Sequence, residues 1–136
     1  MSNAVVAVRY LLANDAAVLA AVPAIRIKAG ALPINTVLPA LSIDHISTVE
    51  RNTVAMNTAE VFATSRVQVT VFSKTYSQCK SILELVRKAL PHTRGSTGGV
   101  DLDSILPDSA NPDIYDAEDG VHMQSRDFIV QFSEAT

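Results

Sequence analysis

The clearest hydrophobic pattern in the chain is a strand followed by a helix between residues 66 and 90. Every second residue from Val67 to Val71 is a valine, and this period of two is typical of a strand with one apolar face. Thr75 is expected to cap the helix with Gln78 as its capping-box partner, and Pro91 is expected to end it. Apolar residues recur every three or four positions and predict an amphipathic helix that packs through Cys79, Ile82, Leu83, Val86 and Leu90.

Weaker patterns predict further elements on both sides of this block. Two short helices are expected over about residues 5–12 and 18–22, with Asn14 or Asp15 capping the second. Nearby prolines indicate that a strand at 100–106 lies at a sheet edge or is irregular. In all, alternating apolar residues predict strands over residues 25–28, 41–47, 66–72, 100–106 and 121–132.

The last of these strands has a clean apolar face only from Phe128 onward. Upstream, the polar residues His122, Gln124 and Arg126 would share that face. Either a β-bulge shifts the alternation, or this half of the strand projects beyond the core.

Three connecting segments are predicted to be loops or turns. Residues 48–63 are mostly polar and weakly patterned, and they predict a long hairpin loop of a length that is often functional. Glycines mark a turn at 95–99, and the acidic stretch 115–120 is also turn-like.

The order of these elements predicts an α+β fold. The chain has 136 residues, and no repeat or linker divides it, so residues 1–136 are expected to form a single domain. We expect two layers, in which a mainly antiparallel or mixed β-sheet carries two main helices on one face. With 48% hydrophobic and 18% charged residues, the composition is that of an ordinary globular protein.

Charge and cysteine content narrow the classes of function. The net charge of -3 gives no sign of a surface built to neutralise nucleic-acid phosphates, so sequence-specific nucleic-acid binding is not expected. The single cysteine, Cys79, excludes an intrachain disulfide and a multi-cysteine zinc site, and a reducing cytoplasm is its natural setting. No run reaches the roughly 18 apolar residues of a membrane-spanning helix, so no membrane partner is expected.

No catalytic or cofactor-binding motif stands out. The stretch RGSTGG lacks the P-loop lysine and does not follow a strand, so it is interpreted as a turn. His45, His92 and His122 are scattered, and Cys79 lies on an apolar helical face typical of a buried residue. We therefore expect no enzyme activity, no catalytic residues and no cofactor.

Acidic residues between positions 101 and 119 are the best candidates for a metal site. Their spacing does not fit an EF-hand loop, and prolines interrupt them. The favoured interpretation is a solvated turn region, so no metal is expected. The residues concerned are Asp101, Asp103, Asp108, Asp113, Asp116, Glu118 and Asp119.

The order of elements resembles that of bacteriophage tail terminator proteins, also described as tail completion or head–tail joining proteins. In that family an early helix precedes an Arg-Ile strand, a proline-led strand, a long loop, an R-V-Q-V-x-V-aromatic strand and a helix with a tyrosine at its start. An acidic turn and a strand with an arginine, an aspartate and a phenylalanine close the chain. The corresponding segments here are Arg26-Ile27, Pro39 to Ile46, Arg66 to Phe72, Tyr76 to Leu90, and Arg126-Asp127-Phe128. The sequence departs from the family in its loop at 49–63 and around 106–113.

The resemblance implies a structural role in virion assembly. Such proteins form rings, typically hexamers, that cap the tail tube at its head-proximal end, stop its polymerisation and offer a surface to the head connector. For this chain the implied partners are further copies of itself, the tail tube protein and the head connector or neck protein. The resemblance also implies assembly in the host cytoplasm, a location in the virion tail, and DNA passing through the opening of the ring.

Candidate interface residues lie on the strand at 66–72 and in the loop before it. On the strand, the face opposite the valines is expected to carry the contacts. Phe72 either shares that face or, if the strand ends there, packs inward, and alternation does not decide between the two. The 100–106 segment offers the strand edge that a ring interface needs. The candidates are Arg66, Gln68, Thr70 and Phe72 on the strand and Glu50, Arg51, Asn52, Met56 and Asn57 in the loop.

Three other functions stay open at this stage. A different phage neck or head-completion protein, or a secretion-tube relative, would differ from a tail terminator mainly in its place in the particle. A small enzyme with an unrecognised site requires a concave pocket that holds two or more perturbed titratable groups. A generic ligand-binding module is disfavoured by the low aromatic content of 5%.

Overall fold

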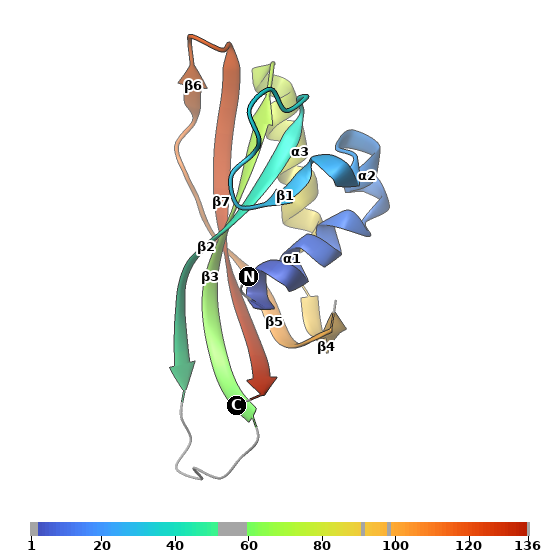
Figure 1. Cartoon of the computed structure of the whole chain (residues 1–136), viewed down its shortest axis with the longest axis vertical. Helices are drawn as coiled ribbons and strands as arrows, with labels where there is room; N and C mark the ends of the chain where they lie inside the picture. The colour runs from blue at the N-terminus through green and yellow to red at the C-terminus, as the bar shows by residue number, and fades with distance from the viewer. Residues whose placement is uncertain (1–2, 52–59, 91, 98, 136) are drawn as a thin grey trace.

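The structure is a computed structural model that describes residues 3–51, 60–90, 92–97 and 99–135 (Figure 1). Its elements in chain order are α1 (Asn3–Ala13), α2 (Ala16–Ala21), the 3₁₀ turn η1 (Ala24–Arg26), β1 (Ile27–Ala29), β2 (Ala40–Arg51), β3 (Glu60–Ser73), α3 (Tyr76–Ala89), β4 (His92–Thr97), β5 (Val100–Ala110), β6 (Ile114–Asp116) and β7 (Val121–Ala135).

The strands form one mixed sheet in the order β1-β2-β3-β7-β5-β4, and β6 pairs with the start of β7. β1 runs parallel to β2, and the other neighbouring pairs are antiparallel. Helices α1, α2 and α3 all lie on one face of the sheet, and no described helix covers the opposite face (Figure 1). This arrangement confirms the predicted α+β fold.

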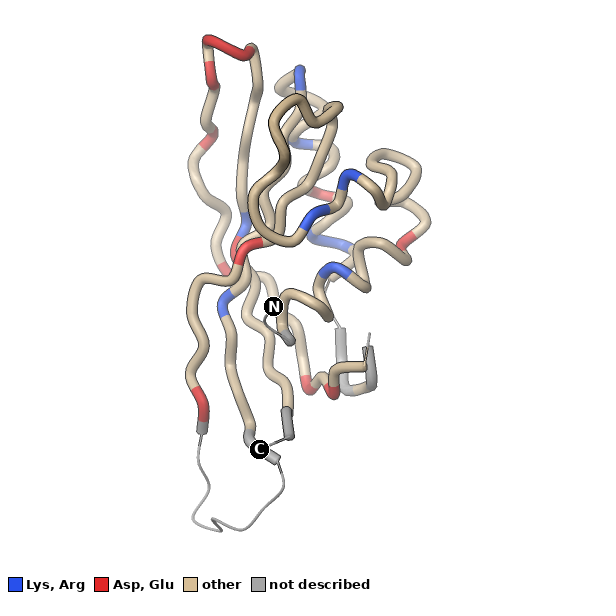
Figure 2. The backbone as a smooth tube through the Cα atoms, in the orientation of Figure 1, with Lys and Arg blue, Asp and Glu red and all other residues tan. Residues whose placement is uncertain are grey.

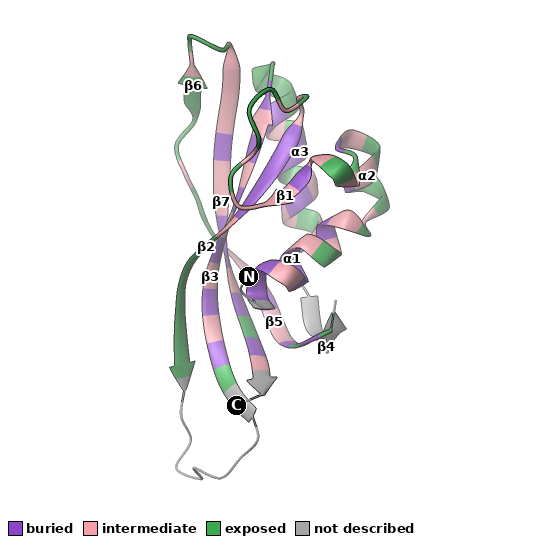
Figure 3. Ribbon diagram, in the orientation of Figure 1, coloured by how far each residue is buried: buried purple, intermediate pink, exposed green. Residues whose placement is uncertain are grey.

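The hydrophobic core lies between the helices and the sheet. Phe128 of β7 is fully buried, and Val67, Val69 and Val71 of β3 lie beside it on the helix-covered face. The face of α3 that covers them is the predicted one, with Cys79, Ile82, Leu83 and Val86 buried. Buried residues therefore alternate along the middle strands, as Figure 3 shows.

Two helices begin at the predicted caps. Thr75 Oγ1 accepts a hydrogen bond of 3.2 Å from the backbone N–H of Gln78, at the first turn of α3. Asp15 Oδ1 accepts the backbone N–H groups of Ala17 and Val18 at 3.0 and 3.1 Å, at the start of α2. Each cap satisfies donors that a helix N-terminus leaves without intrahelical partners.

The prediction that residues 48–63 form a loop is wrong at both ends of this range. β2 continues to Arg51, and β3 begins at Glu60. The two strands stay in regular register from Ser47 opposite Arg66 to Arg51 opposite Phe62, and β7 flanks β3 along the same stretch. Backbone pairing on both sides of β3 therefore imposes strand structure where the hydrophobic pattern is weak. The remainder of that prediction, residues 52–59, lies outside the described residues.

The predicted turn at 95–99 is mostly a strand. β4 runs from His92 to Thr97 and pairs with β5. Its sequence, HTRGST, has no apolar alternation, so pairing with β5 rather than its own pattern makes it a strand. The chain reverses after Thr97, where Gly99 has the positive φ of 81° that glycine adopts at little cost.

The prediction that residues 100–106 form a sheet edge is also wrong. β7 lies on one side of this segment and β4 on the other, through the pair His92–Ile105. The expected irregularity is confirmed, because the β5–β7 register shifts between Leu102 and Ser104 and again between Pro107 and Ala110.

Smaller differences concern the first and last strands. Ile25 belongs to η1 and is exposed, so the first strand begins later, at Ile27. β7 pairs with β3 from His122 to Ala135 without a register shift, so no bulge divides that ladder. Instead, the upstream half of β7 carries polar side chains, including the buried Gln124, under α3.

Candidate functional site

The face of the sheet that no described helix covers is the surface on which the candidate strand residues lie. Arg66, Gln68 and Thr70 alternate with the buried valines, so they point away from the helices, and each is half-buried. β7 contributes Ser125 and Asp127 to the same face, because they pair with Thr70 and Gln68. We call this surface the bare face.

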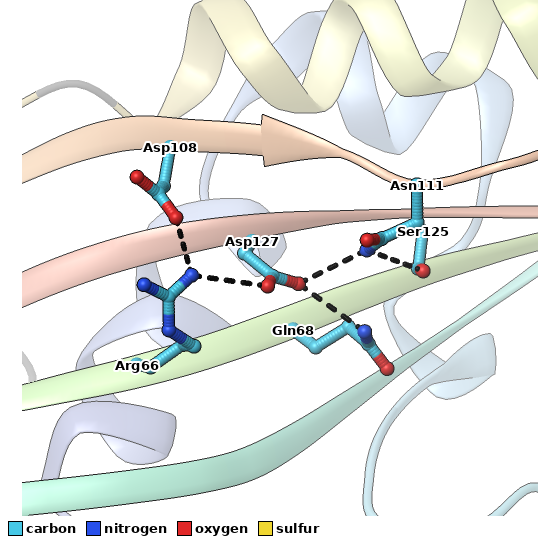
Figure 4. Close-up of polar contacts among 6 residues, drawn as sticks. All are labelled: Arg66, Gln68, Asp108, Asn111, Ser125 and Asp127. Carbon is cyan, nitrogen blue, oxygen red and sulfur yellow. Dashed lines mark hydrogen bonds and ion pairs between the residues drawn. The ribbon is translucent and has the colours of Figure 1, made fainter.

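A hydrogen-bonded network of six residues lies on the bare face (Figure 4). Asp127 is its centre and is only 9% exposed. Its Oδ2 accepts Nη1 of Arg66 at 3.1 Å, and its Oδ1 accepts Nε2 of Gln68 at 3.2 Å and Nδ2 of Asn111 at 3.1 Å. Arg66 also forms an ion pair with Asp108, and Asn111 Nδ2 donates to Ser125 Oγ at 3.0 Å.

This network holds the end of β5 against the middle of the sheet. Asp108 and Asn111 flank the point where the β5–β7 register shifts, and their side chains reach Arg66 and Asp127 across β7. The hydrogen bond to Asp108, and then that to Asp127, raises the pKa of the Arg66 guanidinium. A buried carboxylate is stable only when charges and donors compensate it, and here three donors do so.

A second polar cluster, separate from the Asp127 network, joins β7 to α3. Lys80 Nζ lies 2.5 Å from Asp113 Oδ1 and 2.6 Å from Gln124 Oε1. Tyr76 Oη donates to Asp113 at 3.0 Å, and the His122 ring lies 6.0 Å from the Tyr76 ring. The hydrogen bonds from Lys80 and Tyr76 hold the pKa of Asp113 below its usual value, and the bond to Asp113 raises the pKa of Lys80.

Phe72 stays on the bare face, because β3 continues beyond it to Ser73. It is half-buried and lines a cavity of about 460 Å³ under the connection between β1 and β2. The first of the two alternatives for this residue therefore describes its position. The other residues that line the cavity are Leu32, Pro33, Ile34, Asn35, Thr36, Leu38, Asp119 and Val121.

Of the candidate residues in the predicted loop, the structure describes Glu50 and Arg51, which lie far along β2 from this cavity. Glu50 is exposed near the end of β2, and Arg51 is the last residue of that strand. Asn52, Met56 and Asn57 lie outside the described residues. The structure thus brings Arg66 and Gln68 into one cluster and leaves Glu50 on a separate part of the same sheet.

The charged residues have an uneven distribution along the molecule. Acidic residues Asp116, Glu118 and Asp119 gather at the turn between β6 and β7, at one end of the long axis (Figure 2). At the opposite end, the hairpin arm of β2 and β3 exposes apolar side chains, with Val49 63% and Phe62 45% exposed. The turn end is therefore mainly acidic, whereas the arm end combines exposed apolar side chains with the exposed Glu50.

Three of the residues considered for catalysis, Cys79, His45 and His122, have described side chains with identifiable surroundings. Cys79 is 3% exposed, and burial raises the pKa of its thiol, which disfavours the reactive thiolate. His45 Nε2 lies 2.5 Å from Thr48 Oγ1, and the ring centroids of His122 and Tyr115 lie 4.6 Å apart with the rings tilted by 38°. Nowhere in the described part of the chain do three His, Cys, Asp or Glu side chains gather in a way that could hold a metal ion.

Comparison with known proteins identifies the family. The model of the family described as "Tail completion protein gp17" matches residues 6–130, which is most of the chain. The chain belongs to this family. It is therefore a structural protein of the bacteriophage tail, as its order of elements predicts. No curated protein matches the sequence.

A solved structure has the same fold as this tail completion protein. A chain from the "Virion of native gene transfer agent (GTA) particle" superposes with a TM-score of 0.69 at 16% sequence identity. The match covers 98% of this chain and 100% of that chain. None of the helices that the structure describes has both the length and the apolar character needed to cross a lipid bilayer.

Proposed function

We propose that this tail completion protein assembles into a ring, expected to be a hexamer, that caps the head-proximal end of the tail tube. The ring ends polymerisation of the tube and joins the tail to the head connector, without catalysis. The observation that carries the proposal is the polar centre of the bare face, where Arg66, Gln68 and Asp127 form a hydrogen-bonded network on the side opposite the helix layer. A face of this kind suits a water-filled opening, whereas an apolar face would favour burial against another protein.

The shape of the subunit sets the orientation of the proposed ring. The helices form a second layer on one side of the sheet, so the two sides of the subunit differ (Figure 1). In the proposed ring the helix layer lies at the larger radius, which leaves the polar side chains at the centre of the bare face toward the ring axis. The bare face, with Arg66, Gln68 and Thr70, therefore lines the channel through which the DNA passes.

The two ends of the subunit suit two different partners. A ring between tube and connector meets one protein on each side, and this subunit has an acidic turn at one end and an apolar hairpin arm at the other. Val49 and Phe62 on the arm provide the exposed apolar area that protein–protein contacts commonly bury. Glu50 and Arg51 lie at the same end and are proposed to contact the partner there.

Deletion of the gene tests the proposal. Without the ring, tube polymerisation lacks its stop, so we expect tails of abnormal length that do not join to filled heads. Supplying the wild-type protein from a plasmid should restore tail length and infectious particles. Tails of normal length that fail only at another step of head completion would instead favour a different neck or head-completion protein.

A further inference from the structure

Among the strands that the structure describes, none pairs with the outer side of β2 along most of its length. β1 pairs only with Leu41–Ile43, and no described strand lies beyond residues 44–51. Residues 45–50 are exposed, including the apolar Ile46 and Val49. The strand contains neither lysine nor proline, two residues that commonly protect strand edges in monomers. A register shift between His45 and Ser47 interrupts only its upper part.

β4 is the other end of the sheet. It pairs with β5 on one side, and no described strand lies on its other side. In Figure 1 the lower half of β2 and β4 lie on opposite sides of the same end of the molecule. The described strands thus leave two different sheet edges without a partner strand, as a head-to-tail interface requires.

The two edge strands cover the same stretch of the sheet along the strand axis, and they run in the same direction. Arg51 pairs with Phe62, and the registers continue across β7 and β5 until they reach Ser96 of β4. The pairings that begin at Ser47 lead through Arg66 and Ile129 to Leu106. The neighbouring residue Ile105 pairs with His92, so Ser47 and His92 are offset along the strands by only about one residue. Because four antiparallel steps separate the two strands, β2 and β4 run in the same direction.

We infer that the lower edge of β2 pairs in parallel with β4 of the next subunit, so that one continuous sheet closes around the ring. This inference rests on the proposed function, since it requires a ring. Rotation about the ring axis preserves strand direction, so two strands that run the same way in one subunit meet in parallel. Main-chain hydrogen bonds along residues 47–51 then supply the interface, as in other cases of β-strand addition.

The dimensions agree with a hexamer around DNA. At the level of β4 the sheet contains β2, β3, β7, β5 and β4, and strands lie about 4.8 Å apart, so each subunit spans roughly 24 Å. Six subunits give a circumference of roughly 145 Å and a backbone diameter of roughly 46 Å. Side chains of the bare face then leave an opening that is wide enough for a double helix.

Cysteine cross-linking in assembled tails tests the pairing. In a Cys79→Ala background, one cysteine replaces Ser47 or Val49 and a second replaces each residue of 92–97 in turn. Three strands separate these positions within one subunit, well beyond the Cα distance of about 7 Å that a disulfide tolerates. Any disulfide therefore joins neighbouring subunits, and we expect non-reducing gels to show a ladder of oligomers.

The same cross-linking series also tests whether β2 and β4 pair in parallel. Moving the first cysteine from residue 47 to 49 should move the best partner in β4 toward higher numbers by the same two residues. A shift toward lower numbers would overturn the parallel arrangement. A matched control, Thr64→Cys on the bare face opposite Val49, combined with each cysteine in β4, should give no disulfide.

Electron microscopy of the same tails separates this inference from the proposed function. A ring that is present while no pair in β2 and β4 cross-links would overturn the edge pairing and leave the proposed function intact. Wild-type tails without any ring at the head-proximal end would overturn both.

Discussion

Arg66 and Asp127 are 61 residues apart in sequence, yet Arg66 Nη1 lies 3.1 Å from Asp127 Oδ2 on the bare face of the sheet. The pair is diagonal across the β3–β7 ladder, where Arg66 is opposite Ile129 and Asp127 is opposite Gln68. Asp127 is more deeply buried than Arg66, with a side chain 13% exposed against 35%. The carboxylate is therefore the more buried of the two charges, and it depends on the surrounding donors for compensation.

Replacing Asp127 by alanine should destabilise the fold. The change removes the acceptor of the Gln68 amide and one of the two acceptors of the Asn111 amide, and an unsatisfied donor of this kind typically costs about 1–3 kcal/mol. Urea denaturation followed by circular dichroism measures the loss. The control is Glu118→Ala at the exposed β6–β7 turn, where a change within about 0.5 kcal/mol is expected. Equal stability of both variants would show that the network does not hold β5 in place.

Phenylalanines on the two faces of the sheet should respond differently to truncation. Phe128 is fully buried under the helices, so Phe128→Ala should cost about 3–5 kcal/mol through lost burial and a cavity. Phe62 is 45% exposed on the bare face, so Phe62→Ala should change the free energy of unfolding by no more than about 0.5 kcal/mol. Thermal unfolding of both variants provides the comparison. Similar losses would contradict the assignment of one covered and one bare face.

The thiol of Cys79 should resist modification in the folded protein. Burial raises its pKa, so the thiolate fraction near neutral pH is smaller than for a free cysteine, and access is also restricted. Labelling with an aromatic disulfide reagent should be slow in buffer and complete after unfolding in urea. Rapid labelling of the native protein would mean that α3 does not cover this position.

The Lys80–Asp113 pair should give a pH-dependent difference between the wild type and Asp113→Asn. The folded-state pKa of Asp113 is lowered, so its stabilising contribution is present above its unfolded-state pKa of about 3.9 and is lost as pH falls through the folded value. Lys80 has a raised pKa, so its contribution is present below about pH 10.4 and is lost as pH rises through the folded value.

The pair is solvent-exposed, so the effect should be small and should weaken in salt. Melting temperatures of both proteins from about pH 2 to 8 measure it. We expect the curves to be separated near neutral pH and to converge in acid. A separation that persists unchanged in acid would show that the ion pair is not its cause.

The sequence predicted correctly those elements in which the hydrophobic period, the capping residues and the local propensities agree. The strand at 66–72 and α3 have the correct period, cap and apolar face, so both were predictable. β4 and the lower ends of β2 and β3 were not, because hydrogen bonding to neighbouring strands orders them. Pairing between distant segments leaves little trace in a single sequence.

The candidate site was predictable only in part for the same reason. Alternation placed Arg66, Gln68 and Thr70 on the face opposite the valines, which burial confirms. Asp108 and Asn111 were not found as their partners, since the β5 register shifts bring them there. The role of this face in a ring stays a prediction.

Electron cryo-microscopy of intact tails would show directly whether this protein forms the proposed ring. We expect a closed ring of six copies of this protein at the head-proximal end of the tube. In that ring the bare face with Arg66 and Asp127 lines the channel and the helices lie outside. A head-proximal end without this protein, or a ring with α1 and α3 facing the channel, would contradict it.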